Sequence, residues 1–242
     1  IDSTNQLRLW SIDNFGDDTI AAIRLGGIYY WDESSGVTTR AVNATSLTDA
    51  SNVPTKVLQI MMSDIDRHVI AFGCNAIGSS ILNPLLVRFS DAESLIDWTP
   101  SSTNSAGGVQ LSLGSTIIGA LRTRQEILIW TDAGIVSMRF VGQPFIFSFN
   151  EVATGMSLIS PNAAVNANGQ VFFMDRGSFY TYSGTAQRLP CTVLDYIFSD
   201  INTSQLFKIF GTNNPEHNEV MWFYPSKDSS EIDRYVIYNY LE

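Results

Sequence analysis

The sequence predicts an all-β protein of the β-propeller type, an array of about five four-stranded antiparallel units with one short inserted helix. Two observations predict this fold class. Turn signals recur every six or seven residues between short aromatic and aliphatic runs, which is typical of meandering strands. The pattern also repeats with a period of about 50 residues, within the range of propeller blades. Equivalent positions at the start of each third strand, spaced by 57, 50, 43 and 57 residues, are Gly27, Pro84, Gly134, Gly177 and Arg234.

The clearest unit is the fourth. Asn168-Gly169 is the strongest short signal for a two-residue hairpin turn, because both central positions of that turn require a positive φ. The runs around it are therefore expected to be strands. The four expected strands cover residues 162–167, 170–174, 178–183 and 186–189.

The third unit repeats this pattern. Its expected strands cover residues 116–122, 126–130, 135–140 and 145–151. The turn between the second and third strands has the same Asp-x-Gly pattern in both units: Asp132-Ala133-Gly134 here and Asp175-Arg176-Gly177 in the fourth unit. Asp175 is therefore predicted to shape a turn and not to act as a catalytic group.

Three looser copies complete the array. The first copy has expected strands over residues 19–23, 28–32 and 37–42. The second has them over 56–62, 68–74 and 84–90, and the last over 206–210, 219–224 and 234–240. The last copy lacks a fourth strand, so its closure would need the N-terminal segment or residues beyond Glu242. Aromatic residues on these strands suit contacts between blades: Trp31, Phe89, Trp130, Phe173, Tyr180, Trp222 and Tyr238. An unrelated β-sandwich is the alternative architecture.

One helix is expected between the fourth and fifth units. Leu194, Ile197, Phe198 and Ile201 recur at helical spacing, and Thr192 followed by Asp195 resembles a weak capping box. A single propeller-like domain over residues 1–242 is expected, since all-β domains of this length are common. The chain begins at Ile1 without a Met, which indicates a processed or truncated product.

The composition favours a subunit of a larger assembly. Hydrophobic residues make up 45% of the chain and charged residues only 16%, so much of the surface is expected to be buried against other subunits. The formal net charge is −10, and beyond Arg122 and Arg124 there is no basic cluster of the kind that grips nucleic acid. No run approaches the roughly 18 apolar residues of a membrane span.

The sequence gives little support for a catalytic or metal-binding site. His68 and His217 lack a second ligand at metal-binding spacing, and neither accompanies a nucleophile motif. The carboxylate-rich stretch from Asp13 to Asp18 lacks the Gly and Glu of a calcium loop and predicts a turn. Cys74 and Cys191 are expected to be small buried residues. We therefore predict no catalytic residue, cofactor or metal site.

Several motifs of the sequence resemble those of a known protein family. The most distinctive is Arg88-Phe-Ser-Asp91-Ala-Glu93-Ser-Leu-Ile-Asp97-Trp98-Thr-Pro100, followed by Ser105-Ala-Gly-Gly108. Later motifs add to it: residues 122–132, 138–145, 160–164 and 230–235. Together they cover nearly the whole chain, from Trp10 to Tyr240. In this combination the sequence resembles tail hub or nozzle proteins of tailed bacteriophages, and within them the packaged-DNA stabilisation proteins of short-tailed phages.

The resemblance implies a virion structural protein that is not an enzyme. Propeller-like subunits would form a ring, a hexamer, below the portal and adaptor proteins of the virion tail, after assembly in the host bacterial cytoplasm. The ring would help to retain the packaged genome, continue the channel through which double-stranded DNA passes, and carry tail fibres, spikes or a plug. Members of this family usually run beyond the length of this chain, so a C-terminal part is expected to be missing.

The stretch from Asp91 to Pro100 is the candidate interaction loop, with Asp91, Glu93, Asp97 and Trp98 as its candidate residues. One interpretation is a structured interblade loop in which Trp98 fills a gap between sheets and the acids are solvated. The other is a contact with a neighbouring ring or tail fibre, since aromatic residues flanked by acids favour interfaces.

Two further functions stay open at this point. A propeller that binds carbohydrate or a receptor would use repeated aromatic pockets. A glycosidase would use carboxylate pairs such as Asp64 with Asp66, or two of Asp91, Glu93 and Asp97.

Overall fold

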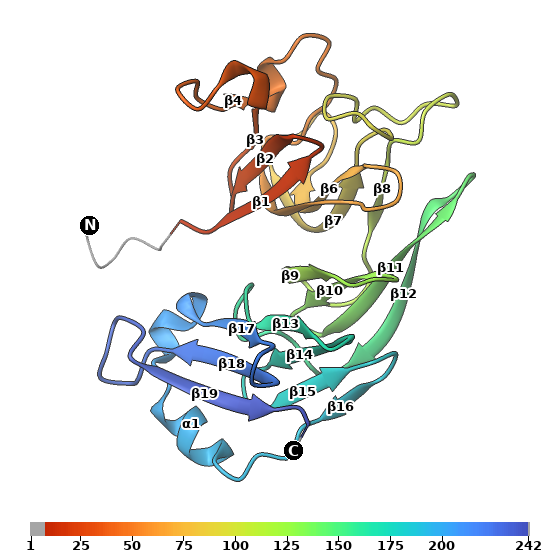
Figure 1. Ribbon diagram of the computed structural model, residues 1–242. Helices are drawn as coiled ribbons and strands as arrows, with labels where there is room; N and C mark the ends of the chain where they lie inside the picture. Colours follow the sequence, from red (N-terminus) through yellow and green to blue (C-terminus); the bar gives the residue numbers. More distant parts are fainter. Residues whose placement is uncertain (1–7, 242) are drawn as a thin grey trace. The chain divides into compact units, whose positions relative to one another are not determined.

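The computed structural model describes residues 8–241 and confirms the predicted fold class. The chain is all-β and propeller-like, with five consecutive antiparallel sheets (Figure 1). Four sheets have four strands and the last has three among the described residues. The chain divides into two compact units, one reaching to Ile117 and including Phe140–Ile146, the other formed by Ile118–Arg139 and Phe147 onward. The single domain expected over residues 1–242 stays a prediction.

Unit 1 contains two sheets, each a meander of four strands. The first runs in the order β1 (Trp10–Phe15), β2 (Asp18–Ile23), β3 (Ile28–Trp31) and β4 (Val42–Asn43). The second runs in the order β5 (Val57–Met62), β6 (Val69–Asn75), β7 (Leu82–Phe89) and β8 (Gly107–Gln110). Their shared core includes Ile20, Ala22 and Ile28 from the first sheet, packed with Val57, Ile60 and Ala71 from the second.

The turn predicted between Asp13 and Asp18 is the hairpin turn at Gly16 and Asp17, and the residues on either side of it belong to β1 and β2, with Phe15 paired to Asp18. The sequence did not indicate β1 because two of its three inward side chains, Ser11 and Asp13, are polar. Ser11 Oγ accepts a hydrogen bond from the Ile60 amide at 3.0 Å, and Asp13 Oδ2 accepts one from the Met62 amide at 2.9 Å. These side chains tie β1 to β5.

The strand predicted over residues 37–42 was wrong except at its end. Only Val42–Asn43 is extended as β4, and the residues before it form turns. The Trp31 indole donates to the Thr39 carbonyl at 3.0 Å, and the Thr39 hydroxyl donates to the Ser35 carbonyl at 2.7 Å. These local bonds satisfy the backbone in a turn and compete with a strand.

The sequence also missed β8, because a Gly-Gly pair is typical of a loop. Here Gly107 pairs with Phe89, and a Cβ at Gly107 would lie 2.7 Å from the Phe89 ring. The glycine is therefore the residue that lets β8 approach β7 beneath an aromatic side chain.

Unit 2 contains most of the remaining strands. One sheet consists of β9 (Ile117–Arg122), β10 (Ile127–Thr131), β11 (Gly134–Gly142) and β12 (Ile146–Thr154), and the next of β13 (Ala164–Ala167), β14 (Gln170–Met174), β15 (Phe179–Tyr182) and β16 (Ala186–Arg188). The last consists of β17 (Phe210–Asn214), β18 (Glu219–Tyr224) and β19 (Arg234–Asn239). The two-residue turn at Asn168 and Gly169 is confirmed, with φ of 50° and 76°.

The segment before the last sheet differs from the prediction. Residues 206–208 lie in a 3₁₀ segment, Thr203–Lys208, and the strand starts only at Phe210. Asn202 begins that segment, since its Oδ1 accepts from the Ser204 amide at 3.0 Å. The predicted helix is confirmed as α1 (Leu194–Asp200), but its N-cap is Val193, without a capping side chain, and not Thr192.

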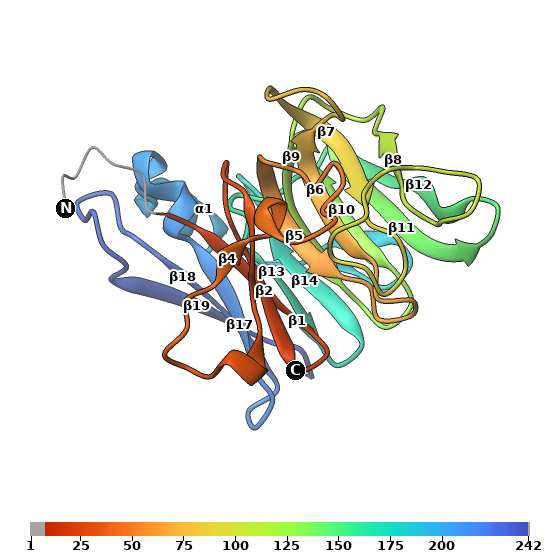
Figure 2. The same cartoon turned by 90° about the horizontal axis from the view of Figure 1, so that it is seen from above.

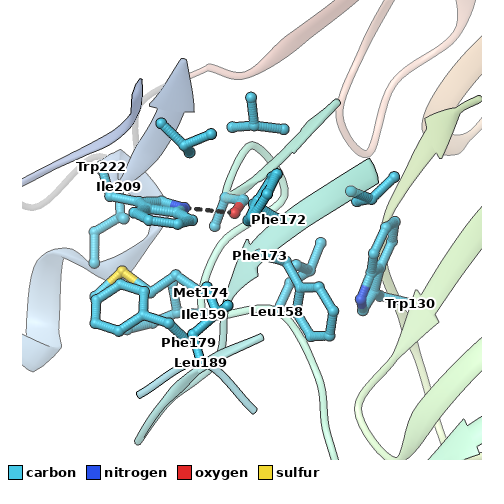
Figure 3. Close-up of a cluster of buried hydrophobic side chains, with 14 of the residues drawn as sticks. Trp130, Leu158, Ile159, Phe172, Phe173, Met174, Phe179, Leu189, Ile209 and Trp222 are labelled. Atoms are coloured by element: carbon cyan, nitrogen blue, oxygen red, sulfur yellow. Dashed lines mark hydrogen bonds between the residues drawn. The ribbon is translucent and has the colours of Figure 1, made fainter. Parts of the chain in front are cut away.

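Aromatic side chains join the sheets of unit 2 (Figure 3). Phe173 packs edge-on against Trp130 of the preceding sheet, with ring centroids 5.5 Å apart. Phe172, on the opposite face of β14, lies 5.8 Å from Tyr238 of the last sheet. Sheet β13–β16 is therefore covered by another sheet on each face.

Hydrogen bonds also connect β13 and the last sheet, which lie side by side (Figure 2). The Trp222 indole donates to the Ala163 carbonyl at 2.9 Å, and the Gly211 amide donates to the Asn162 carbonyl at 2.8 Å. The Ser160 hydroxyl donates to the carbonyl of Ile209. The two sheets are thus joined by directional bonds as well as by apolar packing.

Candidate functional site

The candidate interaction loop connects β7 to β8 within one sheet of unit 1. The expectation of an interblade loop was therefore wrong, and the reason is the missed strand β8. The loop leaves the sheet after Phe89 and returns at Gly107. Its internal hydrogen bonds fix a defined shape.

Arg88, at the end of β7, is the centre of this loop although the sequence did not single it out as a site residue. Its side chain is buried, and its guanidinium donates to three backbone carbonyls: Asn75 at 3.2 Å, Asn52 at 2.8 Å and Trp98 at 3.0 Å. Burial lowers the pKa of Arg88 from its ordinary value. A single arginine within the apolar strand sequence Leu-Leu-Val-Arg-Phe was the signal that could have identified it.

Trp98 is 1% exposed and lies under the Arg88 guanidinium, whose carbon is 5.7 Å from the ring centroid. Its indole nitrogen donates to the Leu95 carbonyl at 2.8 Å, and its amide donates to the Ser51 carbonyl at 3.0 Å. The side chain therefore packs into the core shared by the two sheets of unit 1, and it does not face outward as an interface anchor would.

The two aspartates of the loop accept hydrogen bonds from it. Asp91 Oδ1 accepts from the Ser105 amide at 2.8 Å, the Ser105 hydroxyl at 2.6 Å and the Ala92 amide at 2.9 Å. Asp97 accepts from the Thr99 amide and the Asn104 side chain, each at 3.0 Å. Burial alone would raise the pKa of Asp91, but the bonds from Ser105 and Ala92 lower it.

Glu93 is the candidate residue on the surface. It is exposed, has a φ of 53°, and its amide donates to the Asp66 carbonyl at 3.3 Å. That bond brings the loop next to the turn between β5 and β6. Contact of this surface with another tail protein stays a prediction.

A second polar cluster, in unit 2, was not found from the sequence. The Glu126 side chain, 7% exposed, accepts hydrogen bonds from the Ser137 hydroxyl, the Tyr182 hydroxyl at 3.0 Å and the Arg139 guanidinium at 3.0 Å. Burial, then the hydrogen bond to Glu126, raises the pKa of Tyr182 to about 12. These contacts tie the residue that precedes β10 to β11 and β15.

The remaining candidate residues lie in structural positions. His68 is buried, with Nδ1 2.7 Å from the Ser90 carbonyl oxygen, and His217 is exposed before β18. Cys74 is buried, as expected, whereas Cys191 is only partly so; both thiols are free. Asp175 closes the hairpin turn, where its amide donates to the Ser178 carbonyl at 2.9 Å.

Between residues 8 and 241, no three His, Cys, Asp or Glu side chains come together in a way that could hold a metal ion. In the same part of the chain, no helix has the length and apolar character of a bilayer-crossing segment.

Comparison with known proteins finds no matching family model and no matching curated protein. Among solved structures, 34 chains match. Kluyvelomyces marxianus Hsv2 is 8% identical with a TM-score of 0.42, and a putative gluconolactonase is 10% identical with a TM-score of 0.45. A Synechocystis apocarotenoid oxygenase variant is 10% identical with a TM-score of 0.43.

The matches cover 93%, 91% and 95% of this chain, in the same order. The chain spans 60% of the length of the Hsv2 structure, 70% of the gluconolactonase and 59% of the oxygenase.

Proposed function

We propose that this chain is a structural protein of a phage virion tail, the nozzle or hub ring below the portal and adaptor. In this role it forms part of the DNA ejection channel, helps to retain the packaged genome, and attaches fibres, spikes or a plug. It acts by assembly, as a ring of six copies, without catalytic turnover.

The observation that carries this proposal is the role of the residues in the most distinctive motif. Arg88, Asp91, Asp97 and Trp98 each bond or pack against the backbone of their own loop. The motif that resembles the phage proteins thus specifies the shape of a loop. Such a use of buried polar groups is expected of an architectural module, since satisfied networks make a loop rigid.

The charge of the chain supports passage of DNA without binding. Hydrogen bonds lower the pKa values of Asp32 and Asp233, and at Asp91 they overcome the effect of burial. These groups stay ionised at neutral pH, in a chain with a net charge of −10. An acidic wall repels phosphates, so DNA can move along it without exchanging counterions.

The test is the mass of the purified chain by light scattering, alone and mixed with the portal and adaptor proteins of the same particle. A ring of six 26.8 kDa chains in either condition supports the proposal. Monomer in both conditions contradicts it. An electrophoretic mobility shift with double-stranded DNA at low salt gives the second measurement: no retention is expected, and salt-sensitive binding would contradict the acidic conduit.

A further inference from the structure

The last sheet of unit 2 has one face in the core and one apolar face turned outward. Along β18 the side chains alternate between partly exposed and buried positions. Trp222 and Val220 point into the core of unit 2. On the other side, register places Phe210 opposite Phe223 and Phe223 opposite Tyr235, with Met221 beside Ile237. We call these five side chains the β18 face.

The rings of the β18 face contact one another. Phe210 and Phe223 are stacked, with centroids 5.0 Å apart and an interplanar angle of 13°, and Tyr235 lies 5.9 Å from Phe223. A sugar-binding platform needs ring faces that are open to the ligand, whereas Phe210 and Phe223 each cover one ring face of the other. The β18 face therefore suits packing against another apolar surface better than stacking on sugars.

The first sheet of unit 1 has a similar outward face. Ile12, Ala21 and Tyr29 form one row across β1, β2 and β3, and Trp10 lies 6.1 Å from Tyr29. Trp10 is 50% exposed and Ile12 67%, while Ile20 and Ala22 on the opposite side are buried. We call Trp10, Ile12, Ala21, Ile23 and Tyr29 the β2 face.

Within unit 2, a sheet face of this kind is covered by another sheet. Phe172 packs on Tyr238, and the ring centroids of Phe179 and Trp222 are 4.9 Å apart. Sheets that pack face to face are about 10 Å apart and interlock their side chains. The natural partner of the β18 face is therefore the apolar face of an antiparallel sheet.

Resting on the ring function proposed above, we infer that the β18 face of one copy packs against the β2 face of the next copy. The two faces are different surfaces of one chain, so their contact is head-to-tail and can close into a ring. The outward parts of the side chains supply on the order of 300 Å² of apolar surface per face. That is enough for the apolar centre of an interface of about 800 Å² per partner.

Cross-linking tests this contact directly. Ile12→Cys and Ile237→Cys are made separately in a Cys191→Ser background, while Cys74 stays because it is buried and its thiol is protonated. An equimolar mixture is treated with a short bis-maleimide. Mixed dimers are expected, and neither variant alone should give dimers.

Three cross-linking results would overturn the inference: no mixed dimer, self-cross-linking of either variant alone, or a double variant that cross-links only within one chain. Ile65→Cys replaces Ile12→Cys as the control, because Ile65 is exposed in the turn between β5 and β6. It should give no mixed dimer.

Light scattering separates this inference from the proposed function. If the chain forms a ring but the mixed dimer is missing, the inference fails and the ring stands. If only monomer forms, alone and with portal and adaptor, both fail. In a chain that forms the ring, Ile237→Asp should weaken self-association at least about tenfold, and Ile65→Asp less than about twofold. Equal effects of the two substitutions would also overturn the inference.

Discussion

Arg88 holds Trp98 in two ways: its guanidinium carbon lies 5.7 Å from the ring centroid, and Nη2 donates to the Trp98 carbonyl at 3.0 Å. The same nitrogen donates to the Asn52 carbonyl at 2.8 Å. One buried side chain thus fixes the β7–β8 loop and a segment before β5. The planar fork of arginine supplies the required donors, which lysine cannot place in the same way.

Replacing Arg88 should destabilise unit 1. Arg88→Ala leaves three backbone carbonyls without their donor, and we expect a loss of about 3 kcal/mol in the free energy of unfolding. Arg88→Lys should recover only part of it. Urea unfolding measures both values, and Arg40→Ala, at an exposed position, is the control with an expected change below about 0.5 kcal/mol. A loss at Arg88 no larger than at Arg40 would contradict the assigned role.

The Asp91 carboxylate should stabilise the loop only while it is ionised. Its pKa in the folded protein lies below the usual value, so its contribution is present above the unfolded-state pKa of about 3.9. This stabilising contribution is lost as the pH falls from about 3.9 through the pKa of Asp91 in the folded protein. Asp91→Asn should cost about 1 kcal/mol at pH 7. Unfolding curves at pH 7, 5 and 3 check this, and a difference from wild type that stays constant down to pH 3 argues against it.

Glu126 and Arg139 should differ in importance although they form an ion pair. Glu126→Ala removes the acceptor of Ser137 and Tyr182 in a buried position, with an expected loss of about 2–3 kcal/mol. The Arg139 side chain is 51% exposed, so Arg139→Ala should cost less than about 1 kcal/mol. Thermal unfolding ranks the two variants. Similar losses would mean that the ion pair, and not the hydroxyl donors, provides the stability.

Two turn glycines in one sheet make a matched pair. Both have open space where a Cβ would lie, but only Gly169 has a left-handed φ, 76°. Gly169→Ala should therefore cost about 1 kcal/mol, whereas Gly177→Ala should be neutral or stabilise by about 0.5 kcal/mol. Denaturant midpoints distinguish them, and equal effects would show that backbone conformation does not decide the outcome.

The sequence predicted strands best where short apolar runs are bounded by strong turns. The boundaries of β14 and β18 are those expected, because the Asn168-Gly169 turn and the run from Glu219 to Tyr224 leave little choice. Prediction failed where tertiary contacts decide. β1 has polar inward side chains that bond to β5, and β8 uses glycine to fit beneath Phe89.

The candidate site was only partly predictable for the same reason. The spacing of Asp91, Asp97 and Trp98 indicated a structured loop, but sequence spacing does not tell whether a tryptophan points inward. The inward position of Trp98 depends on Arg88, which donates hydrogen bonds to carbonyls 10 to 36 residues away along the chain. The β18 face was visible only as an alternating strand until register placed Phe210, Phe223 and Tyr235 in one row.

The bonds from Trp222 to Ala163 and from Gly211 to Asn162 give unit 2 a mechanical property. Interlocked apolar side chains resist both separation and sliding of the two sheets, but they impose no preferred bond angle. Hydrogen bonds have preferred angles and break when the sheets shear. Sheets β13–β16 and β17–β19 should therefore carry load as one stiff plate, so that force applied to β19 reaches β13 with little slip between them.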